Sequence, residues 1–264
     1  QCSPFAALAT DVSPKGNRMI CTGWRTLGLL ALALVASCGG GGGGGGPAQR
    51  TALPQEVQDW NPTGNRLDLR SLNYFPLGAG DSWTYNRVEN GSTSPGAVVR
   101  SVQSVNGNSV VVAETEFGAT ETTGYRRSAE GIVILDPFGN SISPAARTLI
   151  GDILEFPEPF YPLGAERRLV RQGNWGADID GDALPESFRF EFKHVLVGFE
   201  TQNLPQGSAE TAHFRSVLTL TLAPSSLAQS VVTVTATEDS WWAPGIGMVR
   251  AERSAIDAGG AIVI

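Results

Sequence analysis

Eight consecutive glycines, Gly39 to Gly46, constrain the fold of this chain more than any other feature. Glycine loses more backbone entropy on folding than any other residue and has no side chain to bury, so this run behaves as a flexible coil. An apolar segment directly before it has no folded neighbour on which to pack. We therefore predict a flexible tether over residues 38–70 and a single folded domain over residues 71–264.

The segment before the glycines has the composition of a secretory signal. Arg25 precedes an uncharged apolar stretch, residues 26–36, which is too short to span a bilayer permanently. The stretch runs into Val35-Ala36-Ser37-Cys38, which resembles the lipobox of bacterial lipoproteins. The resemblance implies a signal peptide over residues 19–37 and a diacylglycerol and palmitate anchor on Cys38. Residues 1–18, ahead of Met19, are interpreted as an upstream extension without a structural role.

The same resemblance implies a location. Gram-negative lipoproteins that stay in the inner membrane carry an aspartate directly after the lipidated cysteine, and Gly39 stands there in this chain. The implied location is the outer membrane, with the lipid as anchor and the domain on the periplasmic face or at the cell surface.

Charge and cysteine content exclude several classes of function. Removal of residues 1–37 takes away three basic residues and one acidic residue, which leaves 16 basic and 25 acidic residues and a net charge of −9. A basic footprint for nucleic acid is therefore missing, and anionic membrane surfaces would repel the domain. Cys2 and Cys21 precede the predicted cleavage site and Cys38 carries the lipid, so no thiol remains for a disulfide or a metal.

Beyond residue 70, apolar and polar residues alternate with a period of two, which is typical of half-buried strands. Phe188, Phe190 and Phe192 alternate with charged residues, so their rings are expected on one face of a sheet. We predict an all-β fold in a single domain: an antiparallel curved sheet, a partly closed barrel or a sandwich. The predicted strands include residues 83–85, 98–105, 110–117, 132–135, 188–192, 213–222 and 231–238.

Turn signals separate these strands. Asn106-Gly107 predicts a type I′ hairpin turn with positive φ at both residues, and Glu130-Gly131 predicts a second turn. Residues 144–154 alone have helical character. Glu114 and Glu116 share one face of a strand and are expected to form a solvated face that discourages edge pairing.

Three stretches lie far apart in the sequence: Tyr74-Phe75-Pro76-Leu77 with Gly80-Asp81-Ser82-Trp83, Val197-Gly198-Phe199-Glu200 with Leu204-Pro205-Gln206-Gly207, and Trp242-Ala243-Pro244-Gly245 with Ile246-Gly247-Met248. Together they resemble a loose group of bacterial envelope lipoproteins, mostly uncharacterised, that have an antiparallel β-fold. The resemblance implies a fold and an envelope location but no reaction. In the third stretch we predict a hairpin turn at Pro244-Gly245, with Trp241 and Trp242 on opposite faces of the strand before it.

An acidic stretch, residues 178–186, is the best candidate for a metal site. Asp178, Asp180 and Asp182 alternate around Gly181, and Glu186 follows, in a pattern that resembles the acidic calcium loops of secreted bacterial proteins. Ca²⁺ prefers six to eight hard oxygen ligands, so a tight turn through these carboxylates predicts a structural Ca²⁺. Ala183 stands where such loops usually place a glycine, and a solvated acidic hairpin is the alternative.

The sequence indicates no catalytic residues. Gly80-Asp81-Ser82 matches the opening of a hydrolase block, but the aspartate and histidine that the mechanism requires downstream are missing at the required spacing. Asp81-Ser82 is interpreted as a turn that opens a strand. His194 and His213 fall within predicted strands, where a metal site shared between them is the less favoured interpretation.

The leading functional hypothesis is a non-enzymatic outer-membrane lipoprotein that binds an apolar or envelope-derived ligand, or a protein partner. Two alternatives remain open: a carboxylate-dependent hydrolase acting on envelope polymers, and a calcium-stabilised, adhesin-like surface module. A deep apolar cavity would favour the first, and an open cleft holding two carboxylates would favour the hydrolase.

The anchor prediction rests on Cys38. Cys38→Ala should abolish incorporation of labelled palmitate, because the thiol is the acceptor of the lipid, and should release a soluble or uncleaved precursor from the membrane fraction. Metabolic labelling followed by fractionation measures both effects. Unchanged labelling of the variant would show that the lipobox interpretation is wrong.

Overall fold

This computed structural model of the chain describes residues 48–89, 92–227 and 230–257. For residues 87–89, 92–96 and 255–257 it describes the backbone alone. The upstream extension, Met19, the predicted signal peptide, Cys38 and the glycine run lie outside the described residues, so these predictions stay as they are. Within the described part, no helix is long and apolar enough to cross a membrane.

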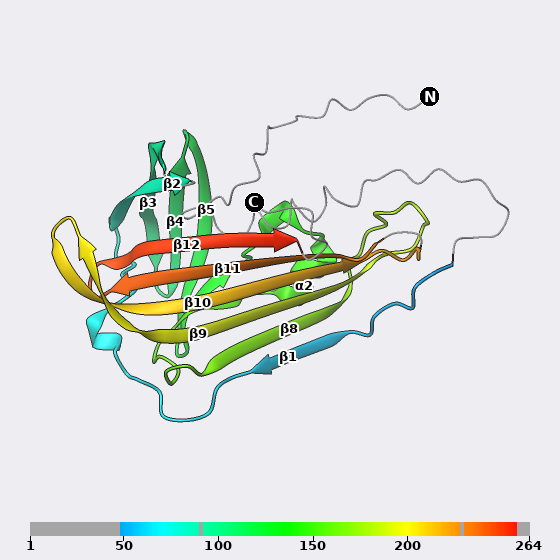
Figure 1. Cartoon of the computed structure of the whole chain (residues 1–264), viewed down its shortest axis with the longest axis horizontal. Coiled ribbons are helices and arrows are strands. Elements are labelled where there is room, and N and C mark those ends of the chain that lie inside the picture. The colour runs from blue at the N-terminus through cyan, green and yellow to red at the C-terminus, as the bar shows by residue number, and fades with distance from the viewer. Residues whose placement is uncertain (1–47, 90–91, 228–229, 258–264) are drawn as a thin grey trace.

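Two antiparallel sheets of six strands each make up the described part of the chain (Figure 1). In one, the strand order is β1-β8-β9-β10-β11-β12, and in the other it is β2-β3-β4-β5-β6-β7. The first sheet contains β1 (Glu56–Trp60), β8 (Glu166–Asn174), β9 (Ser187–Leu204), β10 (Gly207–Ala223), β11 (Val232–Ala243) and β12 (Gly247–Asp257). The second contains β2 (Ser82–Glu89), β3 (Ser92–Asn106), β4 (Ser109–Glu116), β5 (Ala119–Ser128), β6 (Gly131–Leu135) and β7 (Ile153–Pro157). The all-β prediction is confirmed.

The long strands follow the alternation of the sequence. In β9, Phe188, Phe190 and Phe192 are buried and the residues between them are half-buried, so the three rings share the inner face as predicted. The partner strand β10 alternates in the same way, with Phe214 and Leu218 among its buried residues. One face of this sheet therefore forms a continuous apolar surface.

The tight hairpins agree with the predicted strands but not with the predicted turn type. Asn106 pairs with Ser109, so the two turn residues are Gly107 and Asn108, one position later than predicted. Gly107 has a φ of +57°, whereas Asn108 is not among the residues with positive φ, which is the pattern of a type II′ turn. In the next hairpin Phe117 and Gly118 both have positive φ, so the type I′ conformation occurs there.

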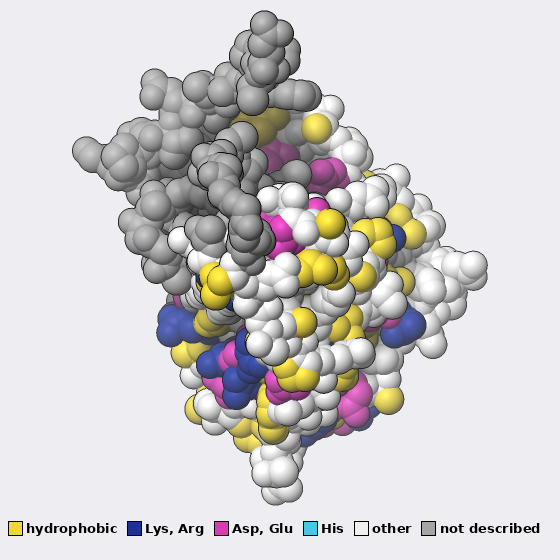
Figure 2. All heavy atoms as spheres, turned by 90° about the vertical axis from the view of Figure 1, so that its right-hand side faces the viewer, with side chains coloured by type: hydrophobic (Ala, Val, Ile, Leu, Met, Phe, Trp, Pro, Cys, Tyr) yellow, Lys and Arg dark blue, Asp and Glu magenta, His cyan; other side chains and the backbone are white. Residues whose placement is uncertain are grey.

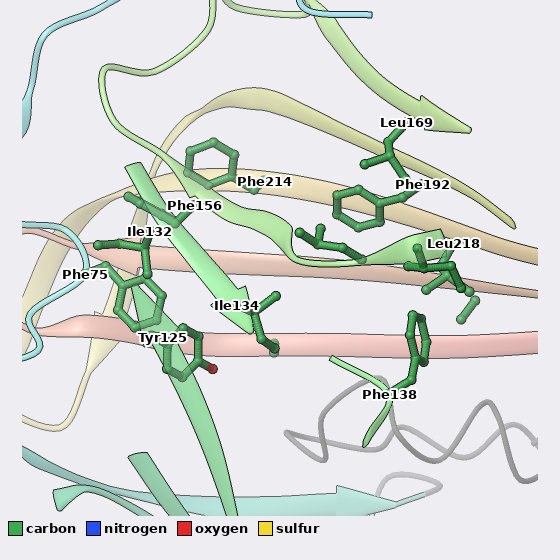
Figure 3. Close-up of a cluster of buried hydrophobic side chains, with 14 of the residues drawn as sticks. Phe75, Tyr125, Ile132, Ile134, Phe138, Phe156, Leu169, Phe192, Phe214 and Leu218 are labelled. Carbon is green, nitrogen blue, oxygen red and sulfur yellow. The ribbon is translucent and has the colours of Figure 1, made fainter. Parts of the chain in front are cut away.

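Aromatic rings fill the space between the two sheets (Figure 3). Phe156 of β7 packs against Phe214 of β10 at 5.1 Å and Trp242 of β11 at 4.9 Å between ring centroids. Phe75, in the segment before β2, lies 4.5 Å from Trp242. Such tilted and edge-on contacts suit the quadrupoles of the rings. The core therefore joins the sheets along their inner faces.

A short helix closes one side of this core. Ser143 caps the N-terminus of helix α2 (Pro144–Ile150), because its Oγ accepts a hydrogen bond from the Ala146 N–H. Pro144 occupies the first turn. A Cβ on Gly173 of β8 would lie 2.9 Å from Leu149, so the glycine allows the helix to approach the strand closely. The predicted helical region is confirmed as far as Ile150, whereas Leu154 belongs to β7.

The predicted tether is too long. Residues 56–60 form β1, which pairs in antiparallel register with β8, and Gln49 and Leu67 form isolated bridges with Ser226 and Phe160. A short 3-10 helix, η1 (Arg70–Leu72), follows. Residues 48–70 therefore follow the surface of the fold. Their polar, proline-containing sequence gives little sign of this, because an edge strand needs an apolar pattern on one face only.

Gly131 and Gly207 provide a matched test of the sheet geometry, because both have a φ of +130°. A Cβ at Gly131 would lie 2.1 Å from the Phe156 carbonyl oxygen, whereas a Cβ at Gly207 would meet nothing within 4 Å. Gly207→Ala should lower the free energy of unfolding by about 1–3 kcal/mol through backbone strain. Gly131→Ala should cost at least about 2 kcal/mol more, because β7 must shift to make room. Urea denaturation measures both, and equal losses would contradict the pairing of β6 with β7.

Candidate functional site

The acidic loop, residues 178–186, connects β8 to β9 and is shaped by its own side chains. Both oxygens of Asp178 accept backbone hydrogen bonds, from the Gly181 N–H at 2.7 Å and the Ala183 N–H at 2.8 Å. Gly181 and Ala183 have φ of +84° and +67°. Ala183 therefore adopts the left-handed conformation for which calcium loops usually use glycine, and the Asp178 carboxylate stabilises the turn.

Three of the four predicted ligands converge in this loop. One carboxylate oxygen from each of Asp178, Asp180 and Glu186 lies within 4.8 Å of the other two. Figure 2 looks onto the end of the molecule toward which this loop extends in Figure 1, and acidic side chains are visible in both the upper and the lower half of this face. Asp182 is not part of the group, because its carboxylate accepts hydrogen bonds from Ser225 Oγ at 2.6 Å and the Leu184 N–H at 2.9 Å.

Glu186 is the unusual member of the group because it is fully buried, with an exposed fraction of 0%. Its Oε1 accepts hydrogen bonds from the Ile179 N–H at 2.8 Å and the Asp180 N–H at 3.1 Å. Its Oε2 is buried and has no hydrogen-bond partner. Burial raises the pKa of this carboxyl, against the effect of the two backbone N–H groups.

A second group of ionisable residues lies between the sheets. Arg100 of β3 contacts Glu114 of β4 at 3.5 Å and donates a hydrogen bond to the Tyr125 hydroxyl at 3.0 Å. On the other side of the same space, Glu238 of β11 forms an ion pair with Arg253 of the neighbouring strand β12. We call this space the inter-sheet pocket; its lining also includes Glu121, Thr123, Glu155 and Met248.

The prediction that Glu114 belongs to a solvated face is wrong. β4 lies between β3 and β5, and the Glu114 side chain is only 18% exposed. Burial raises its pKa to about 7, against the opposing attraction of Arg100. Burial likewise raises the pKa of Tyr125 to about 12. The inter-sheet pocket therefore holds a carboxyl that can be neutral near pH 7.

The dimensions of this pocket do not suit a polymer substrate. Its free volume is about 60 Å³, enough for a few water molecules and far below the several hundred Å³ typical of a ligand site. A sugar ring could not lie between its carboxylates, as glycoside hydrolysis would require. The pocket therefore does not provide the substrate cleft that the hydrolase hypothesis requires.

The remaining candidate groups have structural partners. Ser82 Oγ donates to the Arg100 carbonyl oxygen and Asp81 Oδ2 accepts from the Gly78 N–H, as expected of a turn that opens a strand. His194 is buried between Phe192 and Phe214 and bonds Ser216, and burial lowers its pKa to about 3. His213 lies against Glu200 and Asp239 and stacks on Trp241. The two histidines do not share a site.

The stretches that resemble envelope lipoproteins meet at one end of the molecule. They line a groove with a free volume of about 510 Å³, which we call the end groove. Trp83 of the first stretch donates a hydrogen bond from Nε1 to the Ile246 carbonyl oxygen of the third at 2.5 Å. Trp242 of the third packs on Phe75 of the first, whereas Trp241 faces the other side of the sheet, as predicted. The lining comprises Pro76, residues 81–85, residues 204–206, Gly245, Ile246, Met248 and Val249.

One wall of the end groove is the edge of a strand. Five consecutive residues, 81–85, line it, and successive side chains of a strand point to opposite faces. Trp83 and Tyr85 pack toward the core, whereas Ser82 and Thr84 are exposed, so the groove runs along the backbone between these faces. In the described part of the chain, β2 is the terminal strand of its sheet and pairs only with β3. Sequence reasoning identified these stretches but could not place them together.

Comparison with known proteins gives distant likenesses only. No family model and no curated protein matches the sequence. A protein of Bacteroides fragilis, described as exported and as having a YmcC-like fold, aligns with a TM-score of 0.39 and 16% identity over 70% of this chain and 92% of its own. A protein of Parabacteroides distasonis, described as a lipoprotein, aligns with a TM-score of 0.38 and 13% identity over 72% of this chain and 94% of its own. These values assign neither family nor function to the chain.

Glu114 should make the stability of the domain depend on pH. Its pKa in the folded state, about 7, exceeds its ordinary value of 4.5, so its contribution to stability is fully present below pH 4.5 and is lost as the pH rises through 7. Glu114→Gln, which stays neutral, should raise the free energy of unfolding at pH 8 by about 1–3 kcal/mol relative to the native chain. At pH 4 the same substitution should change the free energy of unfolding little.

Urea denaturation at both pH values measures this difference. Because Glu158 also has a pKa raised to about 7 by burial, only the difference between variant and native chain isolates Glu114. Glu121, an exposed residue that lines the same pocket, provides the control Glu121→Gln. A Glu114→Gln difference that is the same at pH 4 and pH 8 would contradict the prediction.

Proposed function

We propose that the chain is a lipid-anchored protein of the outer membrane that binds, without catalysis, an extended segment of a partner polypeptide in the end groove. The observation that carries this proposal is the edge of β2, which forms one wall of a groove of about 510 Å³. A polypeptide can add to such an edge through backbone hydrogen bonds while its side chains enter neighbouring pockets.

The lining of the end groove favours a polypeptide over an acyl chain. Apolar surface comes from Trp83, Ile246 and Met248, and hydroxyl or amide groups come from Ser82 and Gln206. An acyl chain would contact only the apolar side chains, whereas a peptide can also form hydrogen bonds with the hydroxyl and amide groups. Four residues of β2, 82–85, offer roughly 13 Å of edge, enough to pair with a segment of similar length.

The charge of the groove restricts the partner further. Among the described residues that line the groove, Asp81 alone is charged, and its carboxylate already accepts a hydrogen bond from the Gly78 N–H. A segment rich in apolar and small polar side chains therefore fits better than a strongly charged one. The predicted anchor on Cys38 and the net charge of −9 for residues 38–264 favour a role at the membrane without direct contact with its anionic surface.

Site-specific photocrosslinking in intact cells tests the proposal. A photoreactive phenylalanine analogue at Thr84 or Gln206, both exposed in the groove lining, should give a discrete adduct with a polypeptide. The analogue at Thr122, exposed on β5 and outside the groove, should not. Ile246→Glu should remove the adduct by placing a charge in the groove, while its backbone carbonyl can still accept the Trp83 hydrogen bond.

Val231→Glu provides the matched control, because Val231 and Ile246 are 46% and 45% exposed. It should leave the adduct unchanged. Adducts with lipid alone at both groove positions would instead favour an apolar ligand. An adduct that persists in Ile246→Glu, or forms equally at Thr122, would contradict binding in the end groove.

A further inference from the structure

We propose that Asp178, Asp180 and Glu186 bind a Ca²⁺ ion that fastens residues 48–50 to the folded domain. The site lies in the acidic loop and does not involve the end groove, so it stands or falls independently of the proposed function.

The buried oxygen of Glu186 is the first argument. Oε2 is buried without a hydrogen-bond partner, and a buried carboxylate oxygen left unpaired is costly. The group also brings three carboxylates within 4.8 Å of one another, and among the described residues no lysine or arginine forms an ion pair with any of them. A divalent cation at their centre would supply the missing partner of Oε2 and neutralise most of the charge.

The chemistry of the ligands favours calcium. All three side chains offer hard oxygen atoms, and neither a thiol nor an imidazole belongs to the group. Ca²⁺ accepts six to eight oxygens in irregular geometry, so bidentate carboxylates, loop carbonyls and water can complete its shell. Mg²⁺ demands a smaller octahedral shell and gives up water reluctantly, so it should bind more weakly.

The acidic loop is connected to residues 48–50 through a second segment. Asp180 Oδ2 accepts a hydrogen bond from the Ser226 N–H at 3.0 Å, and Asp182 accepts one from Ser225 Oγ. The Ser225 carbonyl oxygen in turn accepts from the Arg50 N–H at 2.6 Å, and the Leu227 N–H donates to the Ala48 carbonyl oxygen at 2.8 Å.

The side chain of Arg50 completes the attachment. Its guanidinium donates hydrogen bonds to the carbonyl oxygens of Pro224, at 2.9 Å, and Ser226. An ion that holds Asp180 in place would therefore also hold the segment to which Arg50 is bound.

Calorimetric titration of the full chain, purified in detergent micelles and freed of metal with a chelator, tests the site with CaCl₂ as the probe. We expect saturable binding of one ion, and a melting temperature about 5–10 °C higher when Ca²⁺ exceeds its dissociation constant a hundredfold. Asp178→Asn and Glu186→Gln should each weaken binding at least tenfold. Identical melting curves in Ca²⁺ and in chelator, with no heat of binding, would overturn the proposal.

Two further variants separate the site from a general effect of negative charge. Asp182→Asn removes a carboxylate of the same loop that is not in the group, and Glu166→Gln removes an exposed one on β8. Both should retain Ca²⁺ affinity within about threefold. Loss of binding in Asp182→Asn together with normal binding in Glu186→Gln would overturn the assignment of ligands.

Limited digestion with trypsin tests the attachment of residues 48–50. Cleavage after Arg50 should slow at least fivefold in Ca²⁺ relative to cleavage after Arg70 in the same digest, because the Arg70 side chain is exposed in either condition. The ratio should not respond to Ca²⁺ in Asp178→Asn. Normal Ca²⁺ binding without a change in this ratio would show that the ion does not fasten residues 48–50 to the domain.

Discussion

Packing of aromatic rings around Phe156 holds the two sheets together. Its ring, on β7 of one sheet, lies 4.9–5.7 Å from those of Phe214 and Trp242, on β10 and β11 of the other sheet, and of Phe75 and Phe160, in segments between strands. Each such contact stabilises by about 0.5–1.5 kcal/mol beyond the burial of area. Because the sequence leaves no cysteine pair in the folded part, this core must supply the stability that disulfides give many secreted proteins.

A core of this kind limits where function can lie. Rings from β7, β10 and β11 fill the middle of the molecule, and the inter-sheet pocket that remains has room for only a few water molecules. The larger space and the unpaired carboxylate oxygen of Glu186 both occur where strands end. The end groove lies beside the β9–β10 and β11–β12 turns, and the acidic loop lies between β8 and β9.

The sequence predicts the fold class well because alternation is a local property. The inner face of β9 follows from Phe188, Phe190 and Phe192 alone, and the acidic loop follows from its carboxylates. Three features were beyond prediction for physical reasons. The pairing of β1 depends on the distant strand β8, the burial of Glu114 depends on the neighbours of β4, and the end groove requires three stretches that only the tertiary fold brings together. Asp182, predicted as a ligand, is not part of the group because its carboxylate accepts a hydrogen bond from Ser225, about forty residues away in sequence.

The long axis of the molecule separates residues 48–50 from the end groove. In Figure 1 the first described residues enter beside the acidic loop at one end, whereas the β9–β10 hairpin and η1 lie at the other. β10 has 17 residues and so extends roughly 55 Å. The coil predicted for residues 39–47 would have an r.m.s. reach of only about 17 Å. A tether of that length would be shorter than the domain, so a molecule anchored at Cys38 would have room to hold its end groove away from the membrane, where a partner polypeptide can reach the edge of β2.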